Sequence, residues 1–235
     1  MKWLRIALFV GLLLLLVGCG QKDLQEVKVG EVTRSIFYAP LYAAIEEGFF
    51  EDEGLSIQLS TIPGGDKTMT ALLSDGIDIA LIGAETSVYV SGQNPIDKVI
   101  NFAQLTQTDG TFLVARDQNV DFSWDALKDS TFLGQRVGGM PQMAGEFVLK
   151  KQGIDPQNDL TLIQNIDFAN IANAFASGTG DYVQLFEPTA SIFEQQGIGN
   201  IVASFGEVLG AIPYTVFMAK ESTFSEKEMM DSFTK

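Results

Sequence analysis

Residues 27–59 read VKVGEVTRSIFYAPLYAAIEEGFFEDEGLSIQL, and this stretch predicts a strand, a helix and a second strand. Its first six residues alternate between apolar and polar side chains, as in a strand with one buried face. Pro40 suits the first turn of the helix that follows, and apolar side chains recur every fourth residue up to Phe49. Residues 55–59 alternate again, so the stretch predicts one βαβ unit.

The same order of strands and helices continues along the chain in two blocks. In the first block, Asp66 suits the N-cap of a helix, and residues 77–82 form a nearly all-apolar strand of the kind found in buried parallel sheets. Repeated βαβ units predict an α/β fold of parallel sheets with helices on both faces. The second block has helices that begin at Pro141 and Pro188 and strands at residues 131–137, 160–163, 181–186 and 201–203.

The two blocks also resemble each other in detail. In the first, a helix ends at a glycine, a strand starts near Asp78, and Glu85 stands where the next helix begins. In the second, Asp181 and Glu187 hold the same positions in the same order. We therefore expect two similar lobes that face each other across a cleft.

Two β-prone segments, residues 111–115 and 214–219, lie at the boundaries of the blocks. Each would carry the chain from one lobe to the other, and two such crossing strands make a hinge. The last residues, 225–235, start a helix that stops without a cap or a breaker, so we expect the final helix to be truncated.

The composition excludes several classes of protein. The 235 residues include no histidine, which removes a Ser-His-Asp triad, a Cys-His pair and an imidazole metal site. Cys19 is the only cysteine, so the chain forms no internal disulfide and no thiolate zinc cluster. The formal net charge of −15 argues against nucleic acid, whose phosphates attract basic patches. We expect no cofactor.

The N-terminus has the pattern of an export signal. Lys2 and Arg5 precede an apolar run of 13 residues at 6–18, which is too short to span a bilayer. The run ends in Leu-Val-Gly-Cys, which resembles the bacterial lipobox. Cleavage at a lipobox leaves the cysteine, which is Cys19 in this chain, as the first residue of the mature protein. That cysteine carries lipid on its sulfur and usually a fatty acid such as palmitate on its amine. An ordinary signal peptide with a chance cysteine is the alternative. Cleavage would change the net charge from −15 to −17.

Three segments resemble one family of bacterial transport proteins. Residues 37–55 are similar to the first helix of the extracytoplasmic solute-binding proteins for nitrate, taurine, alkanesulfonates and thiamine pyrimidine precursors. Residues 75–80 and 186–188 recur in the same family, and the resemblance covers residues 27–235. It implies a type 2 periplasmic-binding-protein fold, in which two lobes close on a ligand by hinge motion. It also implies an ABC permease as docking partner and a separate ATPase, because nothing in this chain resembles a Walker loop.

These inferences divide the chain into four parts. Residues 1–18 are a signal peptide, 19–26 a lipidated tether, 27–110 plus 217–235 the first lobe, and 111–216 the second lobe. Members of the family generally extend past the second hinge strand, so we expect this chain to be a fragment whose first lobe is incomplete. The resemblance and the lipobox together imply an extracytoplasmic, monomeric lipoprotein on the bacterial cell membrane, and no enzyme.

Candidate ligand residues follow from this topology, because ligands of open α/β sheets bind beyond the carboxyl ends of the strands and beside helix N-termini. Aromatic rings there could stack on a flat ligand or pack within a lobe, and the glycines could donate backbone N–H groups or only form a tight turn. Glutamates could accept ligand N–H groups or stabilise a helix start, and arginines could hold an anion or form salt bridges. The candidates are Arg34, Phe37, Tyr38, Gly64, Gly65, Asp66, Glu85, Thr86, Arg136, Met140 and Glu187.

The candidate residues favour a neutral or amino-bearing heterocycle, such as an aminopyrimidine, over an anion. A buried carboxylate beside an anionic ligand is costly unless it is paired, and three of the candidates are acidic. Tyr182 is a further flat side chain that could stack on such a ring. A sulfonate or nitrate held by an arginine stays open. Two other classes also stay open: a hydrolase that uses Glu85 and Glu187 as paired carboxylates, and a lipid-anchored scaffold.

Overall fold

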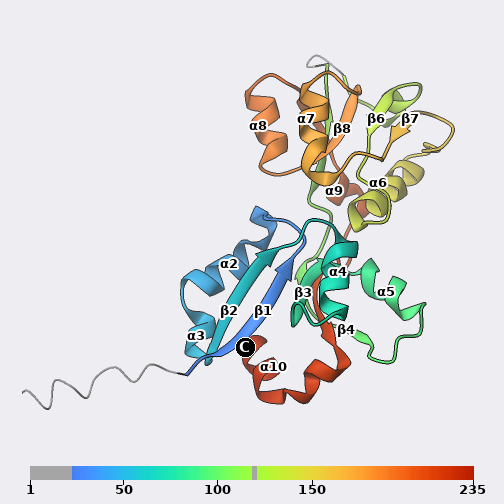
Figure 1. The fold of residues 1–235 in the computed structure, drawn as a ribbon. Coiled ribbons are helices and arrows are strands. Elements are labelled where there is room, and N and C mark those ends of the chain that lie inside the picture. Colours follow the sequence, from blue (N-terminus) through green and yellow to red (C-terminus); the bar gives the residue numbers. More distant parts are fainter. Residues whose placement is uncertain (1–22, 118–120) are drawn as a thin grey trace, which may run out of the picture.

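The structure is a computed structural model that describes residues 23–117 and 121–235. Figure 1 shows two lobes, one above the other, each built around a five-stranded sheet. The predicted signal peptide and Cys19 lie outside the described residues. No helix of residues 23–117 and 121–235 is long and apolar enough to cross a membrane.

The sheet of the first lobe has the strand order β2-β1-β3-β10-β4. Strands β1, β2 and β3 run parallel, and β10 runs antiparallel to both of its neighbours. The bounds are β1 Gln25–Glu31, β2 Leu55–Thr61, β3 Ile79–Gly83, β4 Val99–Thr106 and β10 Thr215–Lys220.

The sheet of the second lobe repeats this arrangement strand for strand, in the order β7-β6-β8-β5-β9. Here β5 is the strand that runs antiparallel to its neighbours, in the place that β10 holds in the first lobe. The bounds are β5 Thr111–Ala115, β6 Thr131–Leu133, β7 Thr161–Ile163, β8 Tyr182–Phe186 and β9 Asn200–Ser204.

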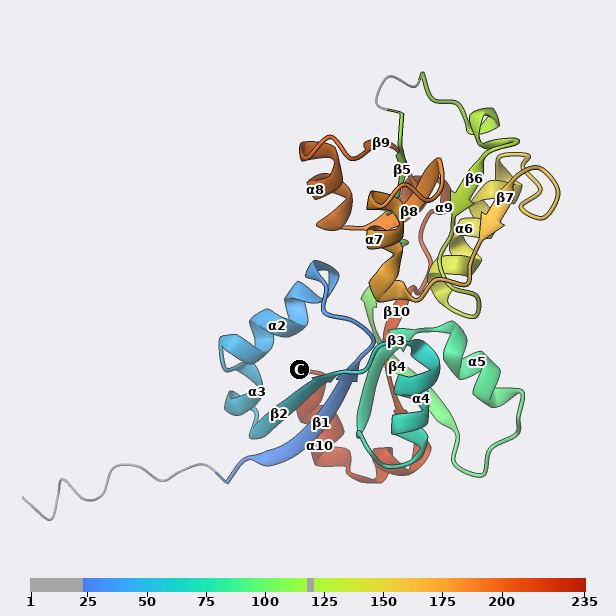
Figure 2. The same cartoon turned by 45° about the horizontal axis from the view of Figure 1, so that its top comes forward.

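Helices cover both faces of each sheet (Figure 2). In the first lobe, α2 (Ala39–Glu46), α3 (Phe49–Asp52) and α10 (Lys227–Phe233) pack on one face, and α4 (Gly65–Leu73) and α5 (Glu85–Ser91) on the other. In the second lobe, α6 (Met140–Lys151) and α9 (Phe205–Leu209) lie opposite α7 (Ile171–Ala176) and α8 (Thr189–Gln195). The 3₁₀ helices are η1 Ile36–Tyr38, η2 Trp124–Leu127, η3 Phe168–Asn170 and η4 Glu221–Ser225.

The expected α/β fold with two βαβ lobes is confirmed, but the sheets are mixed and not purely parallel. The reason is the path of the chain: β10 and β5 each enter their sheet from the other lobe and so run against the local strands. The two crossings, residues 107–110 and 210–214, run side by side, since the N–H of Ile212 donates to the carbonyl of Gln107. The segments expected to form hinge strands therefore hold interior strands, and the chain crosses immediately before each of them.

One local expectation was wrong, and one strand was not expected. Asp66 does not cap α4; Gly64 does, with a φ of 108° that favours glycine, and Asp66 lies in the first turn. Strand β4 has no counterpart in the sequence pattern, because it forms the edge of its sheet and both of its faces are partly open to solvent.

Candidate ligand-binding site between the lobes

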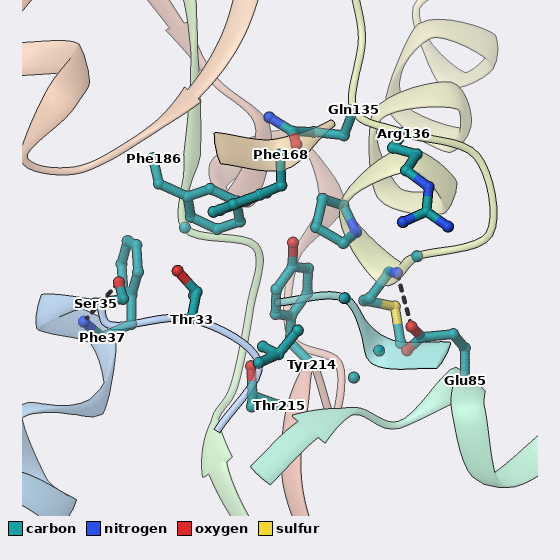
Figure 3. Close-up of a pocket in the computed structure, with 18 of the residues that line it drawn as sticks. Thr33, Ser35, Phe37, Glu85, Gln135, Arg136, Phe168, Phe186, Tyr214 and Thr215 are labelled. Atoms are coloured by element: carbon teal, nitrogen blue, oxygen red, sulfur yellow. Dashed lines mark hydrogen bonds between the residues drawn. The ribbon is translucent and has the colours of Figure 1, made fainter. Parts of the chain in front are cut away.

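A pocket of about 210 Å³ lies between the lobes and is lined from both of them. Figure 3 shows that side chains from the two lobes converge on it. The first lobe and the first crossing contribute Val32, Thr33, Ser35, Phe37, Tyr38, Gly64, Gly65, Asp66, Gly83, Glu85, Thr106, Thr108, Gly110 and Thr215. The second lobe and the second crossing contribute Gln135, Arg136, Val137, Gly138, Gly139, Met140, Pro141, Phe168, Phe186 and Tyr214.

Aromatic rings from both lobes form one wall of the pocket. Phe37 meets Phe186 edge to face, with ring centroids 5.7 Å apart, and Phe168 packs on Phe186 at 5.4 Å (Figure 3). Gly110 gives Phe37 its place, since a Cβ on Gly110 would lie 2.2 Å from the ring. Such a wall suits a flat, apolar ring that stacks or packs edge-on.

The loop that carries Phe37 is anchored by a buried carboxylate, Glu31, at the end of β1. The hydroxyl of Tyr42 donates to Glu31 Oε2 at 2.5 Å, and the hydroxyl of Thr61 donates to Oε1 at 2.7 Å. Arg34 Nε lies 3.1 Å from Oε1, and its guanidinium covers the ring of Tyr42. Arg34 is therefore engaged with Glu31 and does not line the pocket.

Glu85 is the buried carboxylate of the pocket. Its residue is only 7% exposed, and it stands at the first position of α5, directly after β3. Oε1 accepts a hydrogen bond of 2.9 Å from the backbone N–H of Met140, the first residue of α6 in the other lobe (Figure 3). Oε2 is buried and accepts no hydrogen bond from another described residue. Burial raises the pKa of Glu85 from 4.5 to about 7, against the lowering effects of its own backbone N–H and of the Met140 N–H.

A second contact between the lobes lies where the pocket opens to solvent. Arg136 Nη2 is 3.3 Å from Asp66 Oδ2, and Arg136 Nη1 is 3.9 Å from Asp167. All three side chains are substantially exposed, so these pairs add little to stability but neutralise the cation. Among the described residues, Arg136 is the only arginine or lysine that lines the pocket.

Buried amides fix the N-terminus of α6 within the second lobe. Gln184 donates from Nε2 to the hydroxyl of Thr111 at 2.8 Å and to the carbonyl of Pro141 at 3.0 Å. Gln135, which lines the pocket, donates from Nε2 to the carbonyl of Gln184 at 2.7 Å. This network ties the start of α6 to β5 and β8, so the backbone N–H of Met140 is held rigidly toward Glu85.

Two buried tyrosines line the pocket. Desolvation raises the pKa of both Tyr38 and Tyr214, so both hydroxyls stay neutral at any physiological pH. Asp109 faces Tyr214, and burial also raises the pKa of this carboxyl, which accepts hydrogen bonds from the backbone and hydroxyl of Thr111.

The structure brings most of the sequence candidates together. Eight line the pocket: Phe37, Tyr38, Gly64, Gly65, Asp66, Glu85, Arg136 and Met140. Three do not: Arg34 pairs with Glu31, Thr86 is buried with its hydroxyl on the carbonyl of Gly83, and Glu187 caps its own helix by accepting from the N–H and hydroxyl of Ser191. Tyr182 packs against Phe122 inside the second lobe, away from the pocket.

The aromatic residues Phe168, Phe186 and Tyr214 and the amide Gln135 were not among the candidates. Phe186 ends β8, so its position at the carboxyl end of a strand is a signal that could have found it. Glu187 turns into α8 and not into the pocket, so the structure does not bring together the pair of Glu85 and Glu187 that the hydrolase hypothesis named. The described residues contain no cluster of three or more potential metal ligands.

Comparison with known proteins places this architecture in a family. The model of the NMT1-like family matches residues 20–233. The chain is 63% identical over 232 residues to the "Putative binding protein YtlA" of Bacillus subtilis (strain 168), a match that covers 97% of this chain and 70% of that protein.

Solved structures share the fold at low sequence identity. The alkanesulfonate-binding protein SsuA from Xanthomonas axonopodis pv. citri, bound to MOPS, superposes with a TM-score of 0.72 at 18% identity, over 90% of this chain and 71% of that one. The periplasmic nitrate-binding protein NrtA from Synechocystis PCC 6803 gives 0.72 at 18% identity, over 89% of this chain and 59% of that one. The chain therefore belongs to the NMT1-like family and has the two-lobed fold of the periplasmic binding proteins.

Proposed function

We propose that this chain is the substrate-binding subunit of an ABC importer, which captures a small solute between its lobes and delivers it to a membrane permease with a separate ATPase. The observation that carries the proposal is the pocket itself, which draws its walls from two lobes joined by paired crossings. Such a pocket closes around a ligand by hinge motion and buries most of its surface. The similarity to "Putative binding protein YtlA" supports a binding role.

The ligand we propose is an amino-bearing heterocycle, such as an aminopyrimidine. Phe37, Phe168 and Phe186 offer flat apolar surface to a ring, and Glu85 Oε2 offers a buried acceptor to a ring or amino N–H group. Of the three acidic candidates on which the choice of ligand rests, Glu187 drops out, because its carboxylate caps α8.

The second candidate is a sulfonate or nitrate, as the names of SsuA and NrtA state for those proteins. The observation that favours it is Arg136, together with the backbone N–H of Gly139 beside the pocket, whereas the N–H of Gly138 already donates to Gln142 Oε1. Against it, Arg136 already pairs with Asp66, and a donor-free anion would face the carboxylate of Glu85.

We also propose that the protein is extracytoplasmic, held at the bacterial membrane by lipid on Cys19, and monomeric. The sequence Leu-Val-Gly-Cys at residues 16–19 supports the anchor. Acyl chains must supply the attachment, because a strongly acidic chain gains nothing electrostatically from anionic lipid.

The test is calorimetric titration of ligand-stripped protein with 4-aminopyrimidine, taurine and nitrate. We expect micromolar binding of the heterocycle. Binding of taurine or nitrate with none of the heterocycle would move the assignment to the second candidate. A mass spectrum of small molecules that copurify with the protein identifies the natural ligand directly, and the absence of any bound or stabilising solute across a thermal-shift screen would contradict a transport role.

A further inference from the structure

Glu85 is in an unusual position, because one of its oxygens joins the two lobes and the other receives no hydrogen bond from another described residue. Oε1 accepts from the N–H of Met140 across the cleft at 2.9 Å, whereas Oε2 is buried without a hydrogen bond from another described residue. A buried, ionised carboxylate whose acceptors are half-satisfied is costly, and the cost falls only when a donor arrives or water returns.

The second lobe contributes to this cost. Met140 belongs to that lobe and its N–H contacts Glu85, so Glu85 is more exposed to water when the lobes separate. Two events can relieve it: the cleft opens and water solvates the carboxylate, or a ligand places an N–H group on Oε2. The N–H groups of Met140 and of Glu85 itself do not offset the desolvation, since burial is the largest influence on the pKa of Glu85.

We propose that Glu85 makes closure of the cleft conditional on a ligand that donates a hydrogen bond. In the ionised state, Glu85 opposes closure of the empty protein and opposes closure on a ligand that lacks a donor. A ligand N–H that donates to Oε2 removes this energetic cost. The same side chain therefore selects the ligand and permits the closed form to which the permease would bind. The inference rests on the proposed solute-binding function and deepens it.

The proposal implies a proton-linked closure of the ligand-free protein. A protonated Glu85 loses its charge and tolerates burial, so closure of the empty cleft is most favourable below about pH 4.5 and becomes progressively less favourable as pH rises to about 7. The other ionisable groups around Glu85 are Tyr38 and Tyr214, which stay neutral, and the Asp66–Arg136 pair, which is open to water. Asp109 lies beyond Tyr214 and has a raised pKa of its own, but it is unchanged in a Glu85 variant.

Closure is measured as the distance between two spin labels, one on each lobe. Cys19 is the only cysteine, so a C19S chain that carries Q93C and Q157C takes labels at two exposed positions outside the pocket. Gln93 follows α5 in the first lobe, and Gln157 lies between α6 and β7 in the second. The matched control is E187Q, because Glu187 holds the position equivalent to Glu85 in the other block yet caps its own helix.

In the ligand-free protein we expect the labelled chain to shift from a closed distance at about pH 5 to an open one at about pH 8. E85Q, which has no charge to bury, should keep one distribution at both pH values, and E187Q should behave like the parent. A parent chain without the shift, or an E85Q chain that shifts equally, overturns the proposal. This measurement needs no ligand, so it is decided even if the proposed ligand class is wrong.

With ligand at about pH 8, 4-aminopyrimidine should close the parent chain, whereas nitrate and methanesulfonate, which carry no donor, should leave it open. E85Q should bind 4-aminopyrimidine about 10- to 100-fold more weakly, with E187Q unchanged. Closure of the parent by nitrate or methanesulfonate overturns the selective role of Glu85. If 4-aminopyrimidine fails to bind while the ligand-free shift is present, the ligand class falls and the conditional closure stands.

Discussion

Replacing Gly110 with alanine should disturb the aromatic wall of the pocket, because the new methyl group would clash with the ring of Phe37. The new Cβ would lie 2.2 Å from Cζ of Phe37 and 2.5 and 2.7 Å from Cε1 and Cε2. Ordinary contacts between carbon atoms are about 3.5–4.0 Å, so the ring must move by more than ~1 Å, away from its edge-to-face contact with Phe186.

The expected loss of stability is ~2 kcal/mol, the middle of the range for overpacked sites. For a protein of this size that corresponds to a fall in melting temperature of roughly 4–8 °C. Gly92 provides a matched control, because a Cβ there meets backbone oxygens only at 3.6 and 3.7 Å and the ring wall is untouched. G92A should therefore melt close to the parent.

A double variant separates the clash from any other effect of the substitution. In an F37A background the ring is absent, so G110A should add almost nothing to the loss already caused by F37A, and the two changes should be strongly non-additive. Thermal unfolding of the parent, both single variants and the double variant measures the coupling. Additive losses, or a G110A chain with parental stability, would refute the argument that Gly110 exists to admit the ring of Phe37.

Three further predictions concern other parts of the chain. The pKa of Glu85 is raised from 4.5 in the unfolded chain to about 7, so its contribution to stability is present below about pH 4.5 and lost as pH rises through 7. Relative to the parent, E85Q should therefore gain up to ~3 kcal/mol of unfolding free energy between about pH 4 and pH 8, measured by chemical unfolding. A pH-independent difference would contradict this. Y42F removes the hydroxyl that donates to a buried carboxylate, and should lower the unfolding free energy by ~1–3 kcal/mol in the same assay; an unchanged value would show that Glu31 does not depend on this hydroxyl. C19A should leave the membrane fraction on carbonate washing, whereas retention of the variant would count against lipid attachment at Cys19.

The strands and helices could be predicted from the sequence because the buried face of each element requires apolar residues at a regular spacing. Strand β3 is buried at four of its five positions and reads as an apolar run, and α2 shows its apolar face at every fourth residue. Strand β4 could not be found in this way, because an edge strand exposed on both faces has no single polar side. The crossings could be located only to within a strand, since β-propensity does not say to which sheet a segment belongs.

The sequence predicted which segments lie at the cleft, but it did not predict which side chains of those segments point into it. Glu85 and Glu187 hold equivalent positions after equivalent strands, yet one reaches across the cleft to Met140 and the other turns onto Ser191 of its own helix. Arg34 and Arg136 differ similarly, because Glu31 is buried beside only one of them. Such choices depend on which side chain lies opposite in the folded protein, and nothing local in the sequence records that.

The exchanged strands have a consequence for the order in which the chain folds. Strands β5 to β9, residues 111–204, are contiguous, so the second lobe has all five of its strands once that segment is available. The first lobe has four of its strands by residue 106, but β10, between β3 and β4, comes only with residues 215–220. During N-to-C emergence the second lobe can therefore assemble as an autonomous unit, while β3 and β4 wait, unpaired with each other, for a strand made about a hundred residues later. The last strand to arrive thus completes the first lobe and, through the crossing before it, joins it to a second lobe that is already formed.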